Sequence, residues 1–357
     1  MEDKKLQAAL EAWRQLQPLT EEDRTRLSRK FTVDFNYNSN HIEGNTLTYG
    51  QTEILLLFGK VIGEANVKDV QDMTASNVAL KMVNEEIQLK EMPLTQHFIR
   101  TLHLTLLRED YTVYRNQPGG VQTSYIVHAG QYKTRPNSVI TRYGDRFDYA
   151  SPDETPALMT DLVDWYNHAE QEGKLSPVEL AILFHYRYIR IHPFEDGNGR
   201  IARLMVNFIL ARHGYPMIVV RSCLKQHYLE ALHKADMIVG ASPADGAHAS
   251  LKDIRPFHKY MNKLIAEEVA NDVLFVTERN ENVWWYDGQR IAFRTATYSK
   301  ILRTMQIEDQ ATQAYLQEET GINRSALQKM ITALQDKGYI SRDGNGRWRV
   351  FLTPSVQ

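Results

Sequence analysis

Apolar residues recur every three or four positions along most of the first 270 residues. This spacing places them on one face of an α-helix, so it predicts a mainly helical region. Thr20 and Thr95 each precede such a segment, and threonine is a residue type that caps helix N-termini. The segments with this spacing are 21–31, 52–58, 70–89, 95–108 and 157–169.

Two further apolar helices are predicted on either side of a polar loop. Residues 176–191 form the first, with Pro177 in its first turn, where a missing N–H is tolerated. The loop that follows, 192–199, is polar and rich in glycine. The second helix repeats apolar residues at the spacing of one buried face, namely Ile201, Leu204, Met205, Phe208 and Ile209.

Strand-like patterns are short. Residues 130–144, GQYKTRPNSVITRYG, are the clearest, and their central Arg135-Pro136-Asn137 predicts a small hairpin or flap rather than a strand of a sheet core. Residues 283–293, VWWYDGQRIAF, predict a second hairpin that turns at Asp287-Gly288. Asp-Gly favours the positive φ angles of tight hairpin turns.

The last part of the chain has a different pattern. It reads as a helix, a turn at Gly321, a helix capped by Asn323 and stopped by Gly338, and two strands joined by DGNG at 343–346. This order is that of a winged helix. Residues 299–357 hold eight Lys or Arg and six Asp or Glu, a net of +2. Because this charge is small, DNA binding and protein docking both stay open.

The predicted fold class is mainly α: a helical core with a small β-hairpin flap, followed by a small α+β winged-helix domain. At 357 residues the chain is long for a single core. The predicted domains are an N-terminal helical region at 1–95, a core at 96–265, a connecting region at 266–298 and a winged-helix-like domain at 299–357.

Composition narrows the choice of environment and partner. A net charge of -2 gives no overall basic field for nucleic acid or membrane binding. The longest aliphatic run, 54–58, is far shorter than the roughly 18 residues of a membrane span, and the charged N-terminus lacks the apolar region of a signal peptide. A cytoplasmic protein without membrane association is expected. A single cysteine, Cys223, excludes an internal disulfide, and we expect it to be a buried structural thiol.

HPFEDGNGRIAR, residues 192–203, gathers functional groups where the second apolar helix begins. A helix N-terminus has unpaired N–H groups and a partial positive charge. Gly197 and Gly199 let an anion approach the backbone closely. Arg200 and Arg203 fall on one side of the helix, and each guanidinium can bind two phosphate oxygens. The pattern indicates a polyphosphate site.

Asp196 and His192 add a metal ligand and a base to this site. A carboxylate beside a phosphate is favourable when Mg²⁺ bridges the two. His192 lies at the end of the preceding helix, and an imidazole there accepts a proton from a hydroxyl near neutral pH. In the plainer alternative, both residues are helix caps in a polar loop. That alternative explains each residue alone but not the whole set.

The segment resembles the signature of the Fic family, H-x-F-x-D/E-G-N-G-R-x-x-R, and matches it at every fixed position. The resemblance covers residues 30–265 and implies transfer of AMP from ATP to a hydroxyl side chain of a target protein, with release of pyrophosphate. It also implies that His192 is the general base, Asp196 the Mg²⁺ ligand and Phe194 a buried anchor of the loop. The nucleotide-binding residues that it implies here are Gly197, Asn198, Gly199, Arg200 and Arg203.

The same resemblance assigns three further features. Doc-type relatives, which phosphorylate, carry lysine at the position of Gly199 and bind the nucleotide inverted, so glycine here implies nucleotidyl transfer. Residues 130–144 resemble the flap that pairs with a target segment, with Val139 against the nucleotide. Tyr228 is the implied adenine contact, with ordinary core packing as the alternative. Asp236 stands where many relatives have asparagine.

Residues 39–44, SNHIEG, match the inhibitory pattern of the family. The implied inhibitory residues are Ser39 and Glu43, with the Glu43 carboxylate occupying Arg203 in place of the γ-phosphate of ATP. In some relatives the same glutamate orients a water molecule that removes AMP from the target, and the sequence does not separate these two roles. A surface helix that ends at Gly44 is the plainer alternative.

The sequence therefore predicts an ATP- and Mg²⁺-dependent protein adenylyltransferase that modifies a Ser, Thr or Tyr hydroxyl of a protein target and is inhibited by Glu43. Self-modification and homo-oligomerisation stay open, as does the identity of the target. A winged-helix regulator that binds DNA and a pseudoenzyme that only binds nucleotide are the other hypotheses. His192 argues against the pseudoenzyme.

Overall fold

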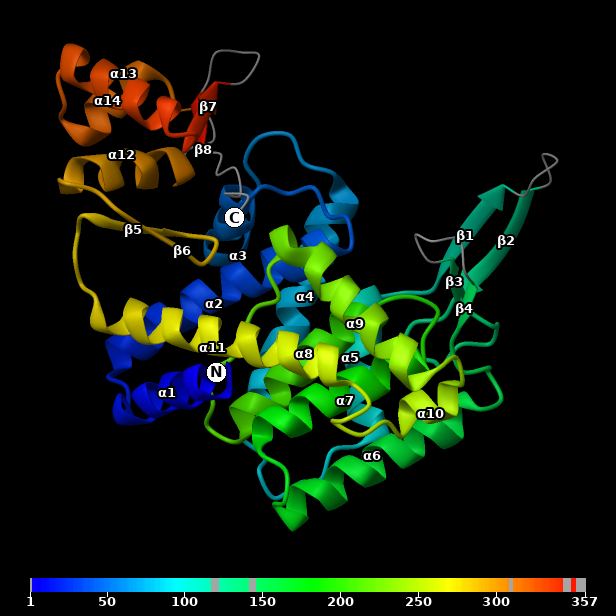
Figure 1. Ribbon diagram of the computed structural model, residues 1–357. Coiled ribbons are helices and arrows are strands. Elements are labelled where there is room, and N and C mark those ends of the chain that lie inside the picture. Colours follow the sequence, from blue (N-terminus) through cyan, green and yellow to red (C-terminus); the bar gives the residue numbers. More distant parts are fainter. Residues whose placement is uncertain (1, 117–121, 141–145, 308–310, 343–347, 351–357) are drawn as a thin grey trace. The chain divides into compact units, whose positions relative to one another are not determined.

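The computed structural model describes most of the chain (Figure 1). The described residues are 2–116, 122–140, 146–307, 311–342 and 348–350. They form two compact units, and each unit is treated by itself. The first comprises Met1–Pro18, Asn38–Glu43 and Ala75–Ala270, and the second comprises Leu19–Tyr37, Gly44–Thr74 and Asn271–Gln357.

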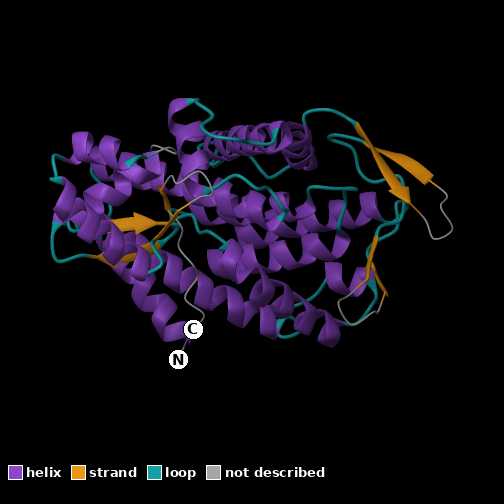
Figure 2. Ribbon diagram, turned by 90° about the horizontal axis from the view of Figure 1, so that it is seen from above, coloured by secondary structure: helices purple, strands orange, loops and turns teal. Residues whose placement is uncertain are grey.

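Helices dominate the described residues, and the strands form separate two-stranded antiparallel hairpins (Figure 2). The predicted mainly helical fold is confirmed. The helices of the first unit are α1 (Glu2–Gln15), α5 (Gln96–Leu107), α6 (Thr155–Glu172), α7 (Pro177–Ile191), α8 (Asn198–Arg212), α9 (Lys225–Val239) and α10 (Pro243–Ala247). Three helices belong partly to each unit: α2 (Glu21–Ile42), α4 (Val67–Glu86) and α11 (Arg255–Thr277).

Helices α7 and α8 form the centre of the first unit. The start of α7 is fixed by a capping box, in which Ser176 Oγ accepts the Glu179 N–H at 3.2 Å and the Glu179 carboxylate accepts the Ser176 N–H at 2.8 Å. Helix α7 packs against α6, α8 and α10. Most side chains of α8 are buried as well. The loop that joins the two helices, residues 192–197, is therefore anchored to packed core at both ends.

The first unit also carries two hairpins. Strand β1 (Tyr111–Asn116) pairs with β2 (Gln122–Val127), and β3 (Ser138–Ile140) pairs with β4 (Arg146–Asp148). The β1–β2 hairpin was not predicted. It extends away from the helices of its unit in Figure 1. Residues that connect its strands, 117–121, lie outside the described part of the chain.

A short hairpin overlaps the predicted segment, but Arg135-Pro136-Asn137 are not at its centre. These residues precede β3, and the connection between β3 and β4 is residues 141–145, which lie outside the described part of the chain. Proline has no N–H to donate to a strand partner, so its place just before the strand is physically reasonable. Val139 lies in β3, where it pairs with Phe147.

The second unit has a hydrophobic cluster that joins distant parts of the sequence. It includes Tyr49 of α3, Trp284 of β5, Ile301 of α12 and Leu327 of α14. The elements of this unit are α3 (Tyr49–Phe58), β5 (Val283–Tyr286), β6 (Gln289–Ala292), α12 (Ala296–Ile307), α13 (Gln313–Thr320), α14 (Arg324–Asp336), β7 (Ile340–Arg342) and β8 (Trp348–Val350).

Most of the predicted turns and caps in this unit are confirmed. Asp287 and Gly288 have φ of 45° and 71° between β5 and β6. Gly321 ends α13 with φ of 71°, and the Asn323 side chain accepts the Ala326 N–H at 2.9 Å to cap α14. Strands β7 and β8 pair after α14, but the DGNG at 343–346 lies outside the described residues. The winged-helix assignment and the four predicted domain boundaries stay predictions.

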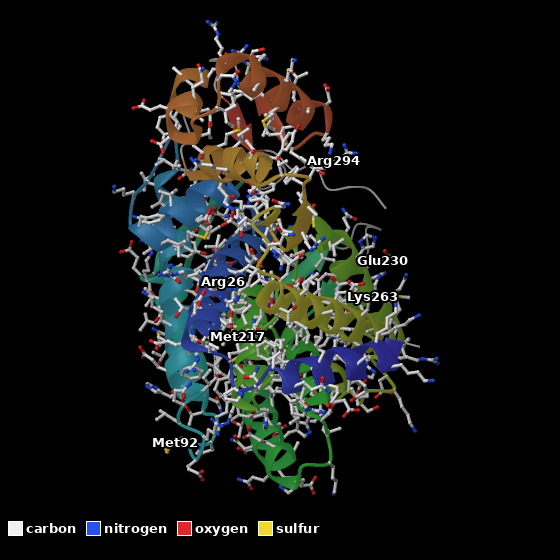
Figure 3. All side chains as sticks on the ribbon, turned by 90° about the vertical axis from the view of Figure 1, so that its left-hand side faces the viewer. Arg26, Met92, Met217, Glu230, Lys263 and Arg294 are labelled. Atoms are coloured by element: carbon white, nitrogen blue, oxygen red, sulfur yellow. The ribbon has the colours of Figure 1, made fainter. Side chains whose placement is uncertain are left out.

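Charged side chains of both signs line the outside of α9 and α11. Glu230 and Lys263 extend away from their helices in Figure 3. Each has a partner one turn along, with Glu230 2.8 Å from Lys234 and Lys263 3.8 Å from Glu267. Exposed pairs of this kind contribute about 0.3–0.5 kcal/mol. These pairs place acidic and basic side chains side by side, so they do not form a basic patch.

Two expectations about burial can be compared with the structure. The expected burial of Cys223 is wrong, since the residue is exposed in the single 3-10 turn Ser222–Leu224 that precedes α9. A single turn that leads into a surface helix buries little of its side chains. Among the described helices, none has the length and apolar character needed to cross a membrane.

Candidate active site

The loop at residues 192–197 owes its shape to two left-handed residues. His192 ends α7 with φ of 51° and ψ of 61°, and its N–H still donates to Tyr188 O at 2.9 Å. Gly197 precedes α8 with φ of 77°. A left-handed conformation is unfavourable for a non-glycine residue, so its occurrence at His192 suggests a functional constraint.

Phe194 and His103 fix the middle of the loop. Phe194 is buried, and its ring stacks on the imidazole of His103 with 3.7 Å between centroids. The Gly130 N–H donates to His103 Nδ1 at 2.9 Å, so His103 Nε2 carries the hydrogen and donates to Asp196 O at 3.0 Å. Burial lowers the pKa of His103 to about 4, which keeps the ring neutral. The anchor role expected of Phe194 therefore involves α5 as well.

Two amides hold the ring of His192. Asn137 Nδ2 lies 2.8 Å from His192 Nδ1, and Asn198 Nδ2 lies 3.1 Å from the same atom. Lys133 Nζ donates to Asn137 Oδ1 at 2.8 Å and the Phe194 N–H donates to Asn198 Oδ1 at 3.0 Å, so both amides turn their NH₂ groups toward the ring. The Nδ1 atom is thus an acceptor, and a neutral ring carries its hydrogen on Nε2.

The surroundings of His192 also keep it uncharged. Burial, followed by the charge of Lys133, lowers the pKa of His192 to about 3. Lys133 lies under the end of α7, where Nζ donates to Ile191 O at 3.2 Å and to His192 O at 2.9 Å. Its own pKa is lowered to about 7 by burial. Tyr149 covers the imidazole face with 4.0 Å between centroids.

The carboxylate of Asp196 is held by three donors. Its Oδ1 accepts the Gly197 N–H at 2.7 Å, and its Oδ2 accepts the Tyr111 hydroxyl at 2.6 Å and lies 3.5 Å from an Arg200 nitrogen. Partial burial raises the pKa of Asp196, but the Arg200 charge and the hydrogen bonds from Tyr111 and Gly197 outweigh it, so the net direction is down. The side chain is 49% exposed. Asp196 is therefore an accessible, ionised carboxylate.

Arg203 lies one turn further along α8, and its guanidinium donates hydrogen bonds to residues 39 and 43. Its Nε donates to Ser39 Oγ at 3.0 Å, and one terminal nitrogen donates to Ser39 O at 2.9 Å and to Glu43 Oε1 at 2.7 Å. Arg203 is only 3% exposed, whereas the Glu43 side chain is 42% exposed. A Cβ at Gly199 would lie 2.6 Å from Glu43 Oε1. Glycine at 199 therefore makes room for this carboxylate.

Arg200 has an unused donor in this arrangement. The residue is buried, and among the described residues its Nε has no hydrogen-bond partner. A buried, unpaired guanidinium donor is unfavourable unless a ligand completes it. This is the observation that points most directly to an anion at the first turn of α8.

The metal role predicted for Asp196 fits the donors present. Among the described residues, no group of three or more His, Cys, Asp or Glu side chains converges on one point. A cage made only of protein ligands is thus absent from this part of the chain. Mg²⁺ commonly takes one or two carboxylates and completes its shell with water and substrate phosphates. One accessible carboxylate beside the predicted phosphate site suits that kind of binding.

The structure brings most of the predicted site residues together in the first unit. His192, Asp196 and Gly197 form the loop, and Asn198, Gly199, Arg200 and Arg203 follow on α8. Ser39 and Glu43 meet Arg203 from the end of α2 and the residue after it. The roles of these residues in binding and catalysis stay predictions.

Tyr228 and Asp236, both on α9, form hydrogen bonds with side chains of α7. Tyr228 is 2% exposed, and its hydroxyl lies 2.8 Å from His185 Nε2. Asp236 accepts the Tyr186 hydroxyl at 2.8 Å and lies 3.3 Å from an Arg190 nitrogen. In this state the Tyr228 ring packs beside Phe257, as the core alternative expects. An adenine contact would require the ring to be uncovered.

Sequence reasoning did not assign several residues that shape the site. They hold the loop through contacts that span tens of positions, so no local pattern marks them. Lys133 and Asn137 lie inside the segment 130–144 that was singled out as a flap, and this was the available signal. These residues are His103, Tyr111, Lys133, Asn137 and Tyr149.

Comparison with known proteins shows the family of this chain. The Fic/DOC family matches residues 93–210. A Fic domain-containing signalling protein from Bacteroides thetaiotaomicron has 52% sequence identity and a TM-score of 0.71, over 76% of this chain and 97% of that one. The chain belongs to the Fic family.

More distant relatives carry an activity in their names. Protein adenylyltransferase fic-1 of Caenorhabditis elegans is 30% identical over 239 residues, which are 67% of this chain and 40% of that protein. A solved structure of Fic-1 from the same organism has 25% identity and a TM-score of 0.60, over 77% of this chain and 73% of that one. The chain thus spans about two fifths of the length of the full adenylyltransferase that it matches.

Proposed function

We propose that this protein transfers AMP from ATP to a Ser, Thr or Tyr hydroxyl of a protein target, which includes its own chain. The observation that carries the proposal is the buried, unpaired Arg200 Nε at the glycine-lined start of α8, beside the ionised Asp196. Such a set of donors suits a polyphosphate that arrives with a cation. The named activity of relatives that match two thirds of this chain supports AMP as the transferred group.

In the proposed reaction, the target hydroxyl oxygen attacks the α-phosphorus of ATP. A bond forms between that oxygen and phosphorus, the bond from phosphorus to the β-phosphate oxygen breaks, and pyrophosphate leaves. The hydroxyl proton passes to the imidazole of His192. Bound Mg²⁺, held by Asp196, would supply charge neutralisation on the phosphates.

Proton acceptance by His192 belongs to a rearranged state. In the structure Asn137 and Asn198 both donate to Nδ1, which leaves the hydrogen on Nε2. For Nε2 to accept a proton, these amide contacts must change so that the hydrogen moves to Nδ1. Asn198 belongs to the predicted phosphate-binding residues, so nucleotide binding offers a partner that draws its amide away from the ring.

Glu43 is the proposed brake on this activity. Its carboxylate accepts a hydrogen bond from a terminal nitrogen of Arg203. The resemblance implies that this arginine binds the γ-phosphate of ATP. Two anions compete for one donor. A hydrogen bond to a charged group is worth about 1.5–3 kcal/mol. Because the Glu43 side chain is 42% exposed, solvent screening lowers this, and the contribution of the pair is on the order of 1–3 kcal/mol. This corresponds to about 10- to 100-fold in productive ATP binding.

Intact-mass spectrometry after incubation with ATP and Mg²⁺ tests both proposals. Glu43→Gly should gain the mass of one or more AMP groups about 10- to 100-fold faster than the protein that keeps Glu43, because the substitution releases Arg203. Adding His192→Ala to this variant should reduce the rate at least about 100-fold with ATP binding retained. A phosphate-sized mass increase would overturn AMP transfer. Equal rates with and without Glu43 would overturn the brake.

Removal of AMP from a modified target is the second candidate, and the ring of His192 favours it. In this reaction water attacks the phosphorus of the AMP ester, the bond from phosphorus to the target oxygen breaks, and a proton of the water ends on that oxygen. The Nε2–H group of the neutral ring can donate a hydrogen bond to the departing oxygen, which the resting hydrogen bonds already permit. Glu43 would then orient the attacking water. This candidate is tested by incubating a target that already carries AMP with the protein that keeps Glu43 and, separately, with Glu43→Gly. Release of AMP that needs Glu43 supports it, and a stable modification with both proteins contradicts it.

A further inference from the structure

The β1–β2 hairpin reaches the predicted metal ligand through a single hydroxyl. Its strands pair over six residues, with Tyr111 opposite Val127 at the base. Val127 packs with Leu107 and Ala129, and Tyr111 packs against the same small cluster. The base of the hairpin is therefore fixed to the end of α5, and the Tyr111 ring has a defined position.

From this position the Tyr111 hydroxyl donates to Asp196 Oδ2 at 2.6 Å. The other oxygen of the carboxylate accepts the Gly197 N–H at 2.7 Å, and Arg200 lies further off at 3.5 Å. Two short bonds, one to each oxygen, set the plane of the carboxylate. Each carboxylate oxygen can accept more than one bond, so both keep capacity for a cation.

A phenol is well suited to orient a metal-binding carboxylate. It donates a hydrogen bond without adding positive charge, so Asp196 keeps its full negative charge for a cation. An ordinary phenol has a pKa of about 10, so the hydroxyl carries its hydrogen at neutral pH. Groups that orient metal ligands in this way typically change metal affinity about 10- to 100-fold when they are removed.

We propose that Tyr111 is a positioning residue for the metal that accompanies ATP, and that its hydroxyl couples the β1–β2 hairpin to that metal site. This inference rests on the proposed function, because it takes Asp196 as the metal ligand. The hydroxyl itself takes no part in bond making. It holds the carboxylate in the orientation in which one of its oxygens meets the cation.

The test compares Tyr111→Phe with Tyr114→Phe in the Glu43→Gly protein. Phenylalanine keeps the ring and removes only the hydroxyl. Tyr114 lies on the same strand but is 66% exposed, so its variant is a matched control for the loss of one phenol. Binding of Mn²⁺ to the ATP-loaded protein is measured from the electron paramagnetic resonance signal of free Mn²⁺. Rates of AMP transfer are measured over a range of Mg²⁺ concentrations.

We expect Tyr111→Phe to weaken Mn²⁺ binding about 10-fold and to raise the Mg²⁺ concentration at half-maximal rate by a similar factor, with the rate at saturating Mg²⁺ changed by less than about 2-fold. Tyr114→Phe should match the parent. Unchanged Mn²⁺ affinity in Tyr111→Phe would overturn the proposal, and so would a lower rate that excess Mg²⁺ does not restore.

Asp196→Asn separates this proposal from the proposed function. If that variant loses Mn²⁺ binding while Tyr111→Phe binds as tightly as the parent, only the role of Tyr111 is wrong. If the parent itself does not bind Mn²⁺ with ATP, the proposed function fails. Thermal midpoints of all variants are measured alongside, and a Tyr111→Phe protein that unfolds like the parent while losing Mn²⁺ affinity supports the positioning role.

Discussion

At the scale of single residues, the state of His192 is set by side chains that are far away in the sequence. Asn137 and Asn198 hold Nδ1, and Tyr149 stacks on one face of the ring. Burial and Lys133 keep the ring uncharged. The two candidate functions differ in whether Nε2 donates a hydrogen bond or accepts a proton, so these neighbours bear on the direction of the reaction.

Two buried histidines predict how stability responds to acid. His103 and His185 are both buried, and burial lowers their pKa values to about 4 and about 3. In the unfolded chain each regains a pKa of about 6.5. Below pH 6.5 the unfolded chain therefore binds protons that the folded protein does not. The free energy of unfolding should fall as pH decreases from about 6.5, by about 2 kcal/mol for each histidine at pH 5.

Urea unfolding at several pH values between 5 and 8 measures this effect. The difference between the unmodified sequence and His185→Gln isolates one histidine from the carboxylates that titrate at lower pH. The variant should show a shallower loss of stability between pH 6.5 and pH 5. If the free energy of unfolding depends on pH in the same way in both proteins, then His185 has the same pKa in the folded and the unfolded chain.

At the scale of elements, hydrogen bonds connect the end of α2 to the start of α9 and to the turn that precedes it. Lys225 Nζ donates to Ile42 O at 2.5 Å, and the Ser222 N–H donates to Asn38 Oδ1 at 2.7 Å. A cation at a helix C-terminus is favourable because the last carbonyls carry partial negative charge. These bonds hold the turn that leads to Glu43, so they support the contact between Glu43 and Arg203.

Lys225→Met is therefore expected to release the proposed brake in part. Self-modification should rise about 2- to 5-fold, since the lost contact is worth about 0.5–1 kcal/mol. In the Glu43→Gly background the same change should have no effect, because no carboxylate is left to hold. Lys234→Met is the control, as Lys234 is an exposed lysine of the same helix that pairs with Glu230. An equal gain in both backgrounds would contradict this role of Lys225.

Helices and caps were more predictable than hairpins. The Thr95 cap of α5, the Pro177 start of α7 and the Asn323 cap of α14 depend on groups within four residues of one another. The β1–β2 hairpin depends instead on its packing against Leu107 and Ala129. Local hydrogen bonds can be inferred from a short stretch of sequence, but packing against another element cannot.

At the scale of the whole molecule, the C-terminal elements share a core with the helix that follows residue 44. Ile301 and Leu327 belong to one cluster with Tyr49 and Trp284. Gln306 also bonds to the Trp284 indole N–H and to Glu53 of α3. A chain cut at the predicted boundary between residues 298 and 299 would divide this cluster.

Ending the chain at residue 298 is thus expected to destabilise the second unit. Trp284, which is 1% exposed, should become solvated, so tryptophan emission should shift to longer wavelength and the thermal midpoint should fall. Full-length Lys329→Ala is the control, because that position of α14 is exposed. Unchanged emission and thermal midpoint would show that the rest of the second unit does not depend on residues 299–357. Tests of DNA or protein binding by this region are best made on the full chain.

The sequence by itself determined the helices, most of the turns and the family. These features depend on short-range spacing, as in HPFEDGNGRIAR, where one loop and one helical turn carry the predicted base, metal ligand and phosphate donors. The sequence also pointed to Ser39 and Glu43, but only through their resemblance to a known pattern.

Tertiary structure decided the chemical state of those residues. The neutral ring of His192, its hydrogen on Nε2 and the orientation of Asp196 all depend on Asn137, Lys133 and Tyr111. Burial and hydrogen bonds between distant segments set pKa values and tautomers, and neither exists until the chain has folded. The exposure of Cys223 was misjudged for the same reason, since burial belongs to the fold and not to the residue type.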